Sequence, residues 1–287
     1  MKIRIFFPLC TVLVVAAIAS WWLLKGNDRN EQALNPQSNN SQARETQKSD
    51  SPHVSELISN RAIDPKFVTP LGPKGFSIVR SGPLRPNGDA LKYVNSLINA
   101  SDGGDATATF KIFLATLDCK RIYARSSTRL EQSDDASRRL SECENLLTDI
   151  PVADADWLTK AAEQGGVEAM IMYSLNPDYT LPGGGQQYLK DPEAVQRWRE
   201  RSRDYLEQAV SLGSQDAMLS LSTAYGAGIF VDENPAGQLA YALAAQKVAP
   251  IPGFQEAYQP LNNSLNPTQR QQAEAWANRI YQQCCKE

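Results

Sequence analysis

One pattern of apolar and small residues, L-x-x-A-x-x-x-G-x-x-x-A, recurs three times along the chain. The leucine and the first alanine share a helical face, and the glycine suits a helix end, where a positive φ requires no side chain. The second alanine is small enough for a following helix to pack closely. Each copy therefore predicts the corner of a helical hairpin, and three corners predict stacked hairpins. The copies comprise Leu97, Ala100, Gly104 and Ala108; Leu158, Ala161, Gly165 and Ala169; and Leu206, Ala209, Gly213 and Ala217.

Helical periodicity extends from about residue 89 to the C-terminus. The segment over 106–124 is apolar on two sides, which is typical of a helix buried between neighbours. Further helical segments are expected over 89–103, 133–147, 156–174, 192–212 and from Pro267 onward. The predicted fold class is all-α, a short α-solenoid of helical hairpin repeats that follows an N-terminal transmembrane helix and a disordered linker.

Residues 5–24 form an apolar run without a charge. At ~1.5 Å per residue, a helix of this length spans the ~30 Å hydrocarbon core of a bilayer. Lys2 and Arg4 precede the run, which favours a cytoplasmic N-terminus. We therefore expect an anchor over 1–25, single-pass in a bacterial inner membrane, with the C-terminal domain in the periplasm. The alternative is a cleaved signal peptide, because the sequence at 17–19 has the small-x-small form of a cleavage site.

The chain changes character twice before the helical pattern begins. Residues 26–52 are polar and cannot bury enough surface to offset their ordering entropy, which predicts a disordered linker. Five prolines interrupt the segment over 53–88, and proline breaks helices. We expect an irregular arm here, packed along the first hairpin. The α-helical repeat domain then occupies 89–287.

Cys119 and Cys143 lie on successive predicted helices, at similar distances from a turn near residue 130. In an antiparallel hairpin they face one another, and exported proteins meet oxidising conditions, so the spacing predicts a disulfide. The alternative is a pair of buried free thiols. Cys284 and Cys285 are adjacent, and their pairing stays open. No metal site is expected, because no cysteine pair has the C-x-x-C spacing typical of zinc.

A long loop over 176–190 contains three consecutive glycines. Long loops in compact domains often have functions, and the aromatic rings of Tyr179 and Tyr188 offer contact surface. On the following helix, Arg197 and Arg201 belong to a series of arginines on the exposed face, which suits an acidic partner. These four residues are the candidate partner-binding residues. The alternatives are a tolerated insertion and a solvated face balanced by neighbouring acids.

Signals for catalysis are scarce in this sequence. The single histidine is His53, beside the polar linker, so Ser-His-Asp and Cys-His mechanisms are unsupported. The sequence lacks H-E-x-x-H, G-x-S-x-G, S-x-x-K and a phosphate-binding loop. We therefore expect neither an enzyme nor a cofactor, with a carboxylate pair brought together by folding as the catalytic alternative. The net charge of −3 argues against nucleic acid as a partner.

The last hairpin bears a family resemblance. Tyr205–Val210, followed by Gly213 and Asp216–Met218, resembles the Sel-one-like repeat, a relative of the tetratricopeptide repeat. Leu158–Gly165 is similar to the same helix ending. Phe230 stands where the family usually has a second glycine in its interhelical loop, and the unusual repeat spacing marks a degenerate array.

The resemblance implies a helical solenoid that acts as an adaptor, often in envelope or secretion contexts. We accordingly expect an exported, membrane-tethered scaffold or adaptor that binds another protein in the cell envelope. One alternative is an immunity protein that binds and neutralises a periplasmic antibacterial toxin, since some exported members of the family resemble such proteins. A cell-envelope hydrolase is the other alternative.

Overall fold

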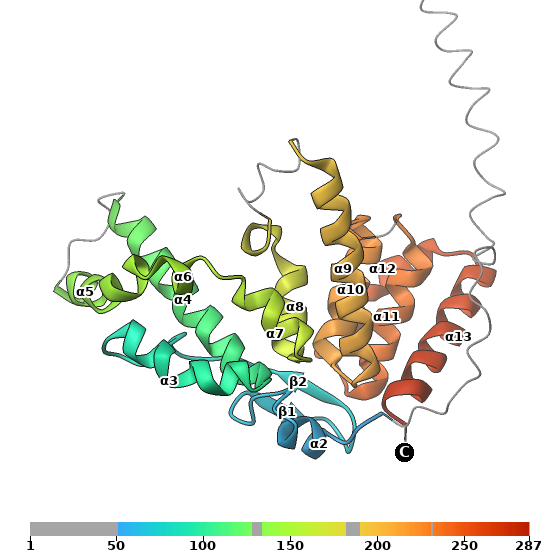
Figure 1. Cartoon of the computed structure of the whole chain (residues 1–287). Helices are drawn as coiled ribbons and strands as arrows, with labels where there is room; N and C mark the ends of the chain where they lie inside the picture. The colour runs from blue at the N-terminus through green and yellow to red at the C-terminus, as the bar shows by residue number, and fades with distance from the viewer. Residues whose placement is uncertain (1–50, 128–133, 182–189, 231, 287) are drawn as a thin grey trace, which may run out of the picture. The chain divides into compact units, whose positions relative to one another are not determined.

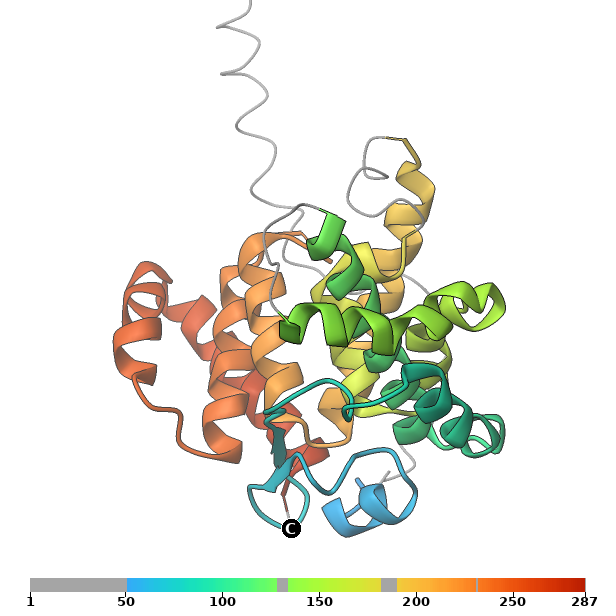
Figure 2. The ribbon, with the colours of Figure 1, turned by 90° about the vertical axis from the view of Figure 1, so that its left-hand side faces the viewer.

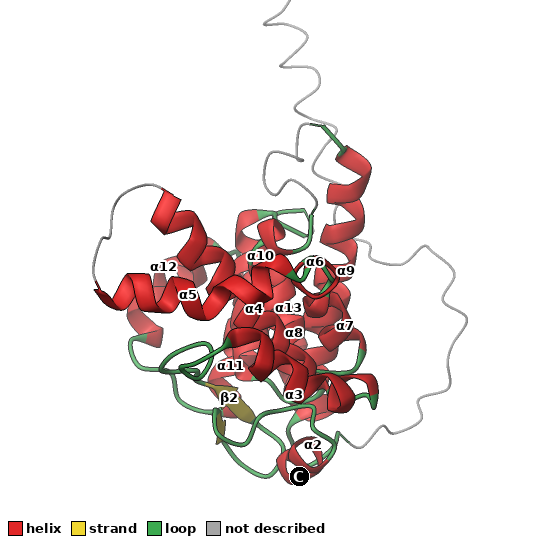
Figure 3. Ribbon diagram, turned by 60° about the vertical axis from the view of Figure 1, so that its left-hand side comes forward, coloured by secondary structure: helices red, strands yellow, loops and turns green. Residues whose placement is uncertain are grey.

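The computed structural model describes residues 51–127, 134–181, 190–230 and 232–286, all within one compact unit, Ser49–Glu287. This part of the chain is mostly helical, with one small two-stranded sheet (Figure 3). None of its helices is both long and apolar enough to cross a bilayer. The predicted all-α chain that opens with a transmembrane helix is therefore corrected to a mostly helical chain with a sheet. Residues 5–24, where that helix was expected, and nearly all of the linker lie outside the described residues.

The elements follow the order of the helical pattern (Figure 1). They are α2 (Val54–Ser59), β1 (Val68–Pro70), β2 (Phe76–Ile78), α3 (Ala90–Asp102), α4 (Ala106–Ser127), α5 (Asp134–Thr148), α6 (Ile150–Ala153), α7 (Trp157–Glu163), α8 (Val167–Leu175), the 3-10 helix η1 (Pro177–Tyr179), α9 (Pro192–Ser211), α10 (Gln215–Ala227), α11 (Pro235–Val248), α12 (Phe254–Ser264) and α13 (Pro267–Cys284). Strands β1 and β2 pair antiparallel, with Thr69 opposite Ser77.

The three corners share one backbone geometry. Gly104, Gly165 and Gly213 have φ values of +89°, +91° and +96°. Each glycine amide donates to the carbonyl three residues earlier, and the next amide donates to the carbonyl of the motif's first alanine, all at 2.9–3.1 Å. This pair of bonds is the Schellman motif, which satisfies carbonyls at a helix C-terminus. The recurring glycine therefore ends α3, α7 and α9 in the same way, and α4, α8 and α10 follow.

The hairpins stack in chain order. Helix α4 packs against α7, α8 against α9, α10 against α11, and α11 against α13, and Figures 1 and 2 show these neighbours side by side. Fully buried side chains such as Leu114, Leu158, Met170, Leu206 and Met218 form the core between them. Helix α5 does not continue this stack, because it packs against α3 and α4 of the first hairpin.

The segment over 51–88, which contains the arm predicted over 53–88 and is called the arm below, reaches beyond the first hairpin, along which the arm was expected to lie. At the first corner, Arg61 Nη1 lies 2.8 Å from Asp105 Oδ2. At the second corner, the Val167 amide donates to the Ala62 carbonyl at 3.0 Å. The arm thus connects two hairpins that are separate in the sequence.

The closest contact of the arm is with the third corner. The Phe76 amide donates to the Gly213 carbonyl at 3.1 Å, and the Ile78 amide donates to Asp216 Oδ2 at 2.7 Å. A Cβ atom on Gly213 would lie 2.2 Å from the Lys74 carbonyl oxygen. Glycine is therefore required twice at this position, by its positive φ and by the approach of the arm backbone.

Candidate partner-binding site

A hollow of about 490 Å³ lies between α9 and the segment formed by α8 and the residues after η1. We name it the α9 hollow. It is lined by Tyr173, Leu181, Ala194, Arg197, Trp198, Glu200, Arg201 and Asp204. Two of the predicted partner-binding residues, Arg197 and Arg201, are thus brought together with aromatic side chains from two different helices.

The start of α9 determines which side chains reach the hollow. Asp191 caps the helix by accepting the Ala194 amide at 2.9 Å, and Pro192 occupies its first turn, a position where proline costs no hydrogen bond. Ala194, Arg197 and Arg201 then follow at spacings of three and four residues, which places them on one helical face. The cap therefore sets the register that directs both arginines toward the hollow.

The floor of the hollow is aromatic and tightly held. Trp198 is only 4% exposed, and its Nε1 donates to the Tyr173 carbonyl at 3.2 Å. The Trp198 ring packs edge-on against Phe230 with centroids 5.4 Å apart. Tyr173 in turn packs edge-on against Tyr205 at 5.1 Å. Because each ring is fixed by a neighbour, the floor is preformed for an apolar side chain.

The rim of the hollow carries exposed charges, of which Arg201 also hydrogen-bonds with Tyr173. The side chains of Arg197 and Arg201 are 66% and 51% exposed, and their nearest carboxylate oxygens, on Glu193 and Glu163, lie 3.7 Å away. Exposed ion pairs of this kind contribute little to stability. A carboxylate from a partner can therefore replace Glu193 or Glu163 at small cost to the fold.

The tyrosines below the rim do not change charge near neutral pH. Burial raises the pKa of Tyr173, against the opposing effect of Arg201. Burial also raises the pKa of Tyr205 to about 12. Both hydroxyls therefore stay protonated at neutral pH and do not act as bases there.

The other two predicted residues are not part of this lining. Tyr179 lies on η1, where its ring packs edge-on against Phe113 at 5.9 Å and its hydroxyl accepts a hydrogen bond from Arg121. It faces α4 rather than α9, so it holds η1 in place beside the hollow. Tyr188 lies outside the described residues.

The sequence predicted only Arg197 and Arg201 of the lining, and among the residues that it missed are Tyr173, Leu181 and Trp198. Trp198 is buried in the core, and one edge of its ring also lines the hollow. Tyr173 and Leu181 come from segments before the loop, and no local pattern relates them to α9. The one available signal was the placement of Trp198 between two arginines, Arg197 and Arg199.

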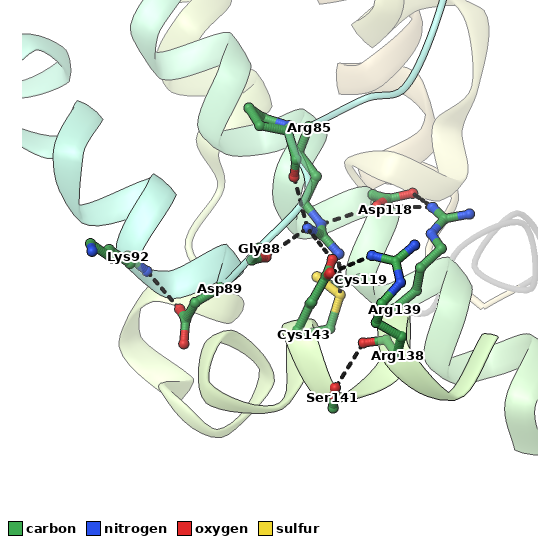
Figure 4. A network of polar contacts seen from close by, with 12 residues as sticks. Arg85, Gly88, Asp89, Lys92, Asp118, Cys119, Arg138, Arg139, Ser141 and Cys143 are labelled. Atoms are coloured by element: carbon green, nitrogen blue, oxygen red, sulfur yellow. Dashed lines mark hydrogen bonds and ion pairs between the residues drawn. A yellow bond between two sulfur atoms is a disulfide. The ribbon is translucent and has the colours of Figure 1, made fainter. Parts of the chain in front are cut away.

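A second polar cluster surrounds the disulfide between Cys119 and Cys143, which links α4 to α5 as the spacing predicted (Figure 4). Arg85, at the end of the arm, has a side chain only 3% exposed and lies 3.2 Å from both Asp118 Oδ2 and Glu142 Oε2. Its Nη2 is also 3.4 Å from the Cys143 sulfur. The cluster therefore fastens the arm to the disulfide-linked hairpin, with its buried cation matched by two carboxylates.

Neither a metal-binding group among the described residues nor a matching protein indicates what the site binds. Within the part of the chain that the structure describes, no group of three or more His, Cys, Asp or Glu side chains could hold a metal ion. Comparisons with protein-family models, with curated proteins and with solved structures found no match.

Proposed function

We propose that this chain is a helical-repeat binding protein that recognises another protein through the α9 hollow. The observation that carries the proposal is the combination of a preformed aromatic floor, built by Tyr173 and Trp198, with the exposed Arg197 and Arg201 at its rim. Aromatic residues and arginine are the types most enriched at the energetic centres of protein interfaces. A hollow of about 490 Å³ has room for one or two large side chains.

The chemistry of the lining defines the segment that fits. An apolar or aromatic side chain of the partner packs on Trp198, and a carboxylate beside it pairs with Arg197 or Arg201. Glu200 and Asp204 line the same hollow, and they repel a carboxylate placed one helical turn further along. The positive and negative side chains around the hollow therefore favour one register of a bound segment that is acidic and partly apolar.

The repeat architecture supports the same class of function. Three hairpins with identical Schellman corners are consistent with a degenerate Sel-one-like array, to which we assign the chain as part of this proposal. Stacked hairpins of this kind offer extended surfaces for partners. The disulfide between α4 and α5 supports an oxidising compartment such as the periplasm, where an adaptor or scaffold of the cell envelope acts.

The test is a site-specific photo-crosslink in cells of the source organism. A photoreactive amino acid replaces Ala194, which lines the hollow without contributing charge. The matched control replaces Gln208, an exposed residue of the same helix outside the lining. We expect protein adducts from position 194 only. Equal adducts from both positions, or none from position 194, would contradict the proposal.

The identity of the adduct then distinguishes the kinds of binding protein. Several envelope components at position 194 support the scaffold. A single stoichiometric hydrolase that is toxic by itself supports an immunity protein instead.

A further inference from the structure

The second cysteine pair packs against the core at the end of the stack and does not line the α9 hollow. Cys284 and Cys285 form a disulfide at the end of α13. A disulfide stabilises mainly by closing a loop of the unfolded chain. Neighbouring residues enclose no such loop, whereas Cys119 and Cys143 are 24 positions apart. The terminal disulfide therefore contributes almost nothing to stability through chain entropy. Its reactivity depends on the residues around it.

Those surroundings form a separate hollow of about 310 Å³ between the arm and the ends of α11 and α13. We name it the C-terminal hollow. It is lined by Leu71, Gly72, Pro73, Gly75, Val248, Tyr281, Cys285 and Lys286. Cys285 is thus the member of the pair that lines the hollow, and it is 8% exposed, whereas Cys284 is only 1% exposed. Lys286 is exposed and lines the same hollow as Cys285, so it adds a positive charge to the lining.

The turn that carries the pair is held on both sides. The Tyr281 carbonyl accepts hydrogen bonds from the amides of Cys285 and Lys286, both at 3.0 Å. The hydroxyl oxygen of Ser51, at the start of the arm, lies 2.9 Å from the Gln283 carbonyl oxygen. Because these bonds do not involve the sulfur atoms, the two side chains stay adjacent when the disulfide opens.

We propose that Cys284–Cys285 is a thiol–disulfide exchange site that reacts with small dithiols entering the C-terminal hollow. A thiolate of the dithiol attacks the Cys285 sulfur, the bond between the cysteines breaks, and Cys284 leaves as a thiolate that takes a proton from water. The second thiol of the dithiol loses its proton and attacks the mixed disulfide at the dithiol's own sulfur, which releases Cys285. The protein disulfide gains two electrons and two protons, and the dithiol is oxidised to a cyclic disulfide.

Lys286 assists both stages of this exchange. Its ammonium group attracts the incoming thiolate and stabilises the thiolate that leaves, as a nearby cation does at reactive cysteines generally. The Cys119–Cys143 disulfide has no such access, because both of its residues are fully buried. The two pairs of one molecule therefore differ in reactivity, and the second pair serves as an internal reference.

The experiment uses the purified full-length protein and dithiothreitol as the probe. Samples taken during reduction are alkylated, and mass spectrometry of peptides quantifies each cysteine. We expect Cys284 and Cys285 to be reduced at least about tenfold faster than Cys119 and Cys143. Equal rates, a slower terminal pair, or alkylation of Cys284 before any reductant is added would overturn the proposal.

Two lysine variants distinguish a site in which Lys286 assists the exchange from a disulfide that reacts only because it is accessible. Lys286→Gln should slow the reduction of the terminal pair several-fold, whereas Lys247→Gln, which removes an exposed cation of α11 outside the hollow, should leave the rate unchanged. Protein in which only the terminal pair has been reduced should also bind phenylarsine oxide, which requires two thiols close together, and Cys285→Ser should abolish this binding. An unchanged rate in Lys286→Gln would remove the assigned role of the lysine and the built site with it.

Discussion

The corner side of the hairpin stack and the α9 hollow use charged and polar residues in opposite ways. At the corners, Arg80 of the arm makes a bidentate contact with Glu168, with N–O distances of 2.9 and 2.8 Å, and both side chains are largely buried. At the hollow, Arg197 and Arg201 are mostly exposed and lie 3.7 Å from their carboxylate neighbours. The buried ion pair is part of the structural framework, whereas the exposed arginines of α9 stay accessible to a partner.

The arm concentrates these buried contacts on one side of the stack. The Arg80 guanidinium also lies over the Phe67 ring, 3.8 Å from its centroid, and Asp64 pairs with Lys111 of α4 at 2.9 Å. Contacts of this kind connect segments that are distant in sequence. The arm therefore joins the hairpins through buried ion pairs, whereas the exposed arginines of α9 are not needed to hold the hairpins together.

The largest effect is expected from Gly213→Ala. The new Cβ would lie 2.2 Å from the Lys74 carbonyl oxygen, so the arm has to move in addition to the cost of a positive φ. We expect a loss of at least about 3 kcal/mol in the free energy of unfolding, measured by denaturant titration.

Gly165→Ala is the matched control for this substitution. Gly165 has a similar φ of +91°, but a Cβ atom added to it would have no neighbouring atom within 4 Å, so only the backbone cost of about 1–2 kcal/mol applies. Equal losses in the two variants would show that the arm does not depend on close contact at the third corner.

Arg80→Gln should have the next largest effect, about 3 kcal/mol at pH 7, because it leaves the Glu168 carboxylate buried without its cation. Burial already raises the pKa of Glu168 above its ordinary value of 4.5, and Arg80 opposes that rise. Without Arg80 the pKa of folded Glu168 rises further, so the folded state binds a proton more readily than the unfolded state. The free energy of unfolding of the variant should therefore fall as pH rises from the unfolded pKa of Glu168 to its raised folded pKa. It should recover on acidification toward about pH 5.

The control for this pH dependence is Arg80→Gln combined with Glu168→Gln. The double variant has no carboxyl group at this position, so its stability should change less with pH over the same range. A single variant that shows no recovery on acidification relative to the double variant would argue against a buried, charged Glu168.

The cysteine pairs provide a third comparison. Replacing both Cys119 and Cys143 by alanine removes a cross-link between positions 24 residues apart, and the free energy of unfolding should fall by about 3 kcal/mol. Replacing Cys284 and Cys285 by serine should change stability much less, because adjacent residues enclose no loop. Thermal unfolding of the two double variants under oxidising conditions measures the difference, and similar losses would contradict the entropic explanation.

The smallest effect on stability is expected from Arg197→Gln combined with Arg201→Gln. Their ion pairs are exposed and long, so the free energy of unfolding should stay within about 0.5 kcal/mol of the original. Denaturant titration beside Gly213→Ala tests this directly. A loss comparable to that of the corner variants would mean that the rim of the hollow is part of the structural framework.

The corners could be predicted from sequence because their causes are local. A glycine, an alanine four residues before it and an alanine four residues after it specify a helix end and the start of the next helix, and Gly104, Gly165 and Gly213 all adopt the expected positive φ. The facing positions of Cys119 and Cys143 were predictable for the same reason, because they follow from the periodicity of two neighbouring helices.

The arm and the hollow depend on contacts that no local pattern records. Ser77 donates to Asp216 across 139 positions of sequence, and nothing in the arm's composition indicates this partner. Arg197 and Arg201 were identifiable as exposed residues of α9. Their aromatic neighbour Tyr173 comes from α8, so the hollow appears only when the hairpins are stacked.

The most direct test of the central claim is the affinity of the partner captured at position 194, measured by calorimetry for three proteins. These are the original chain, the variant with Arg197→Gln and Arg201→Gln, and Arg279→Gln, which removes an exposed arginine of α13 outside the hollow. We predict at least about tenfold weaker binding for the double variant and unchanged binding for Arg279→Gln. Unchanged affinity in the double variant, or equal weakening in both, would contradict the assignment of binding to the α9 hollow.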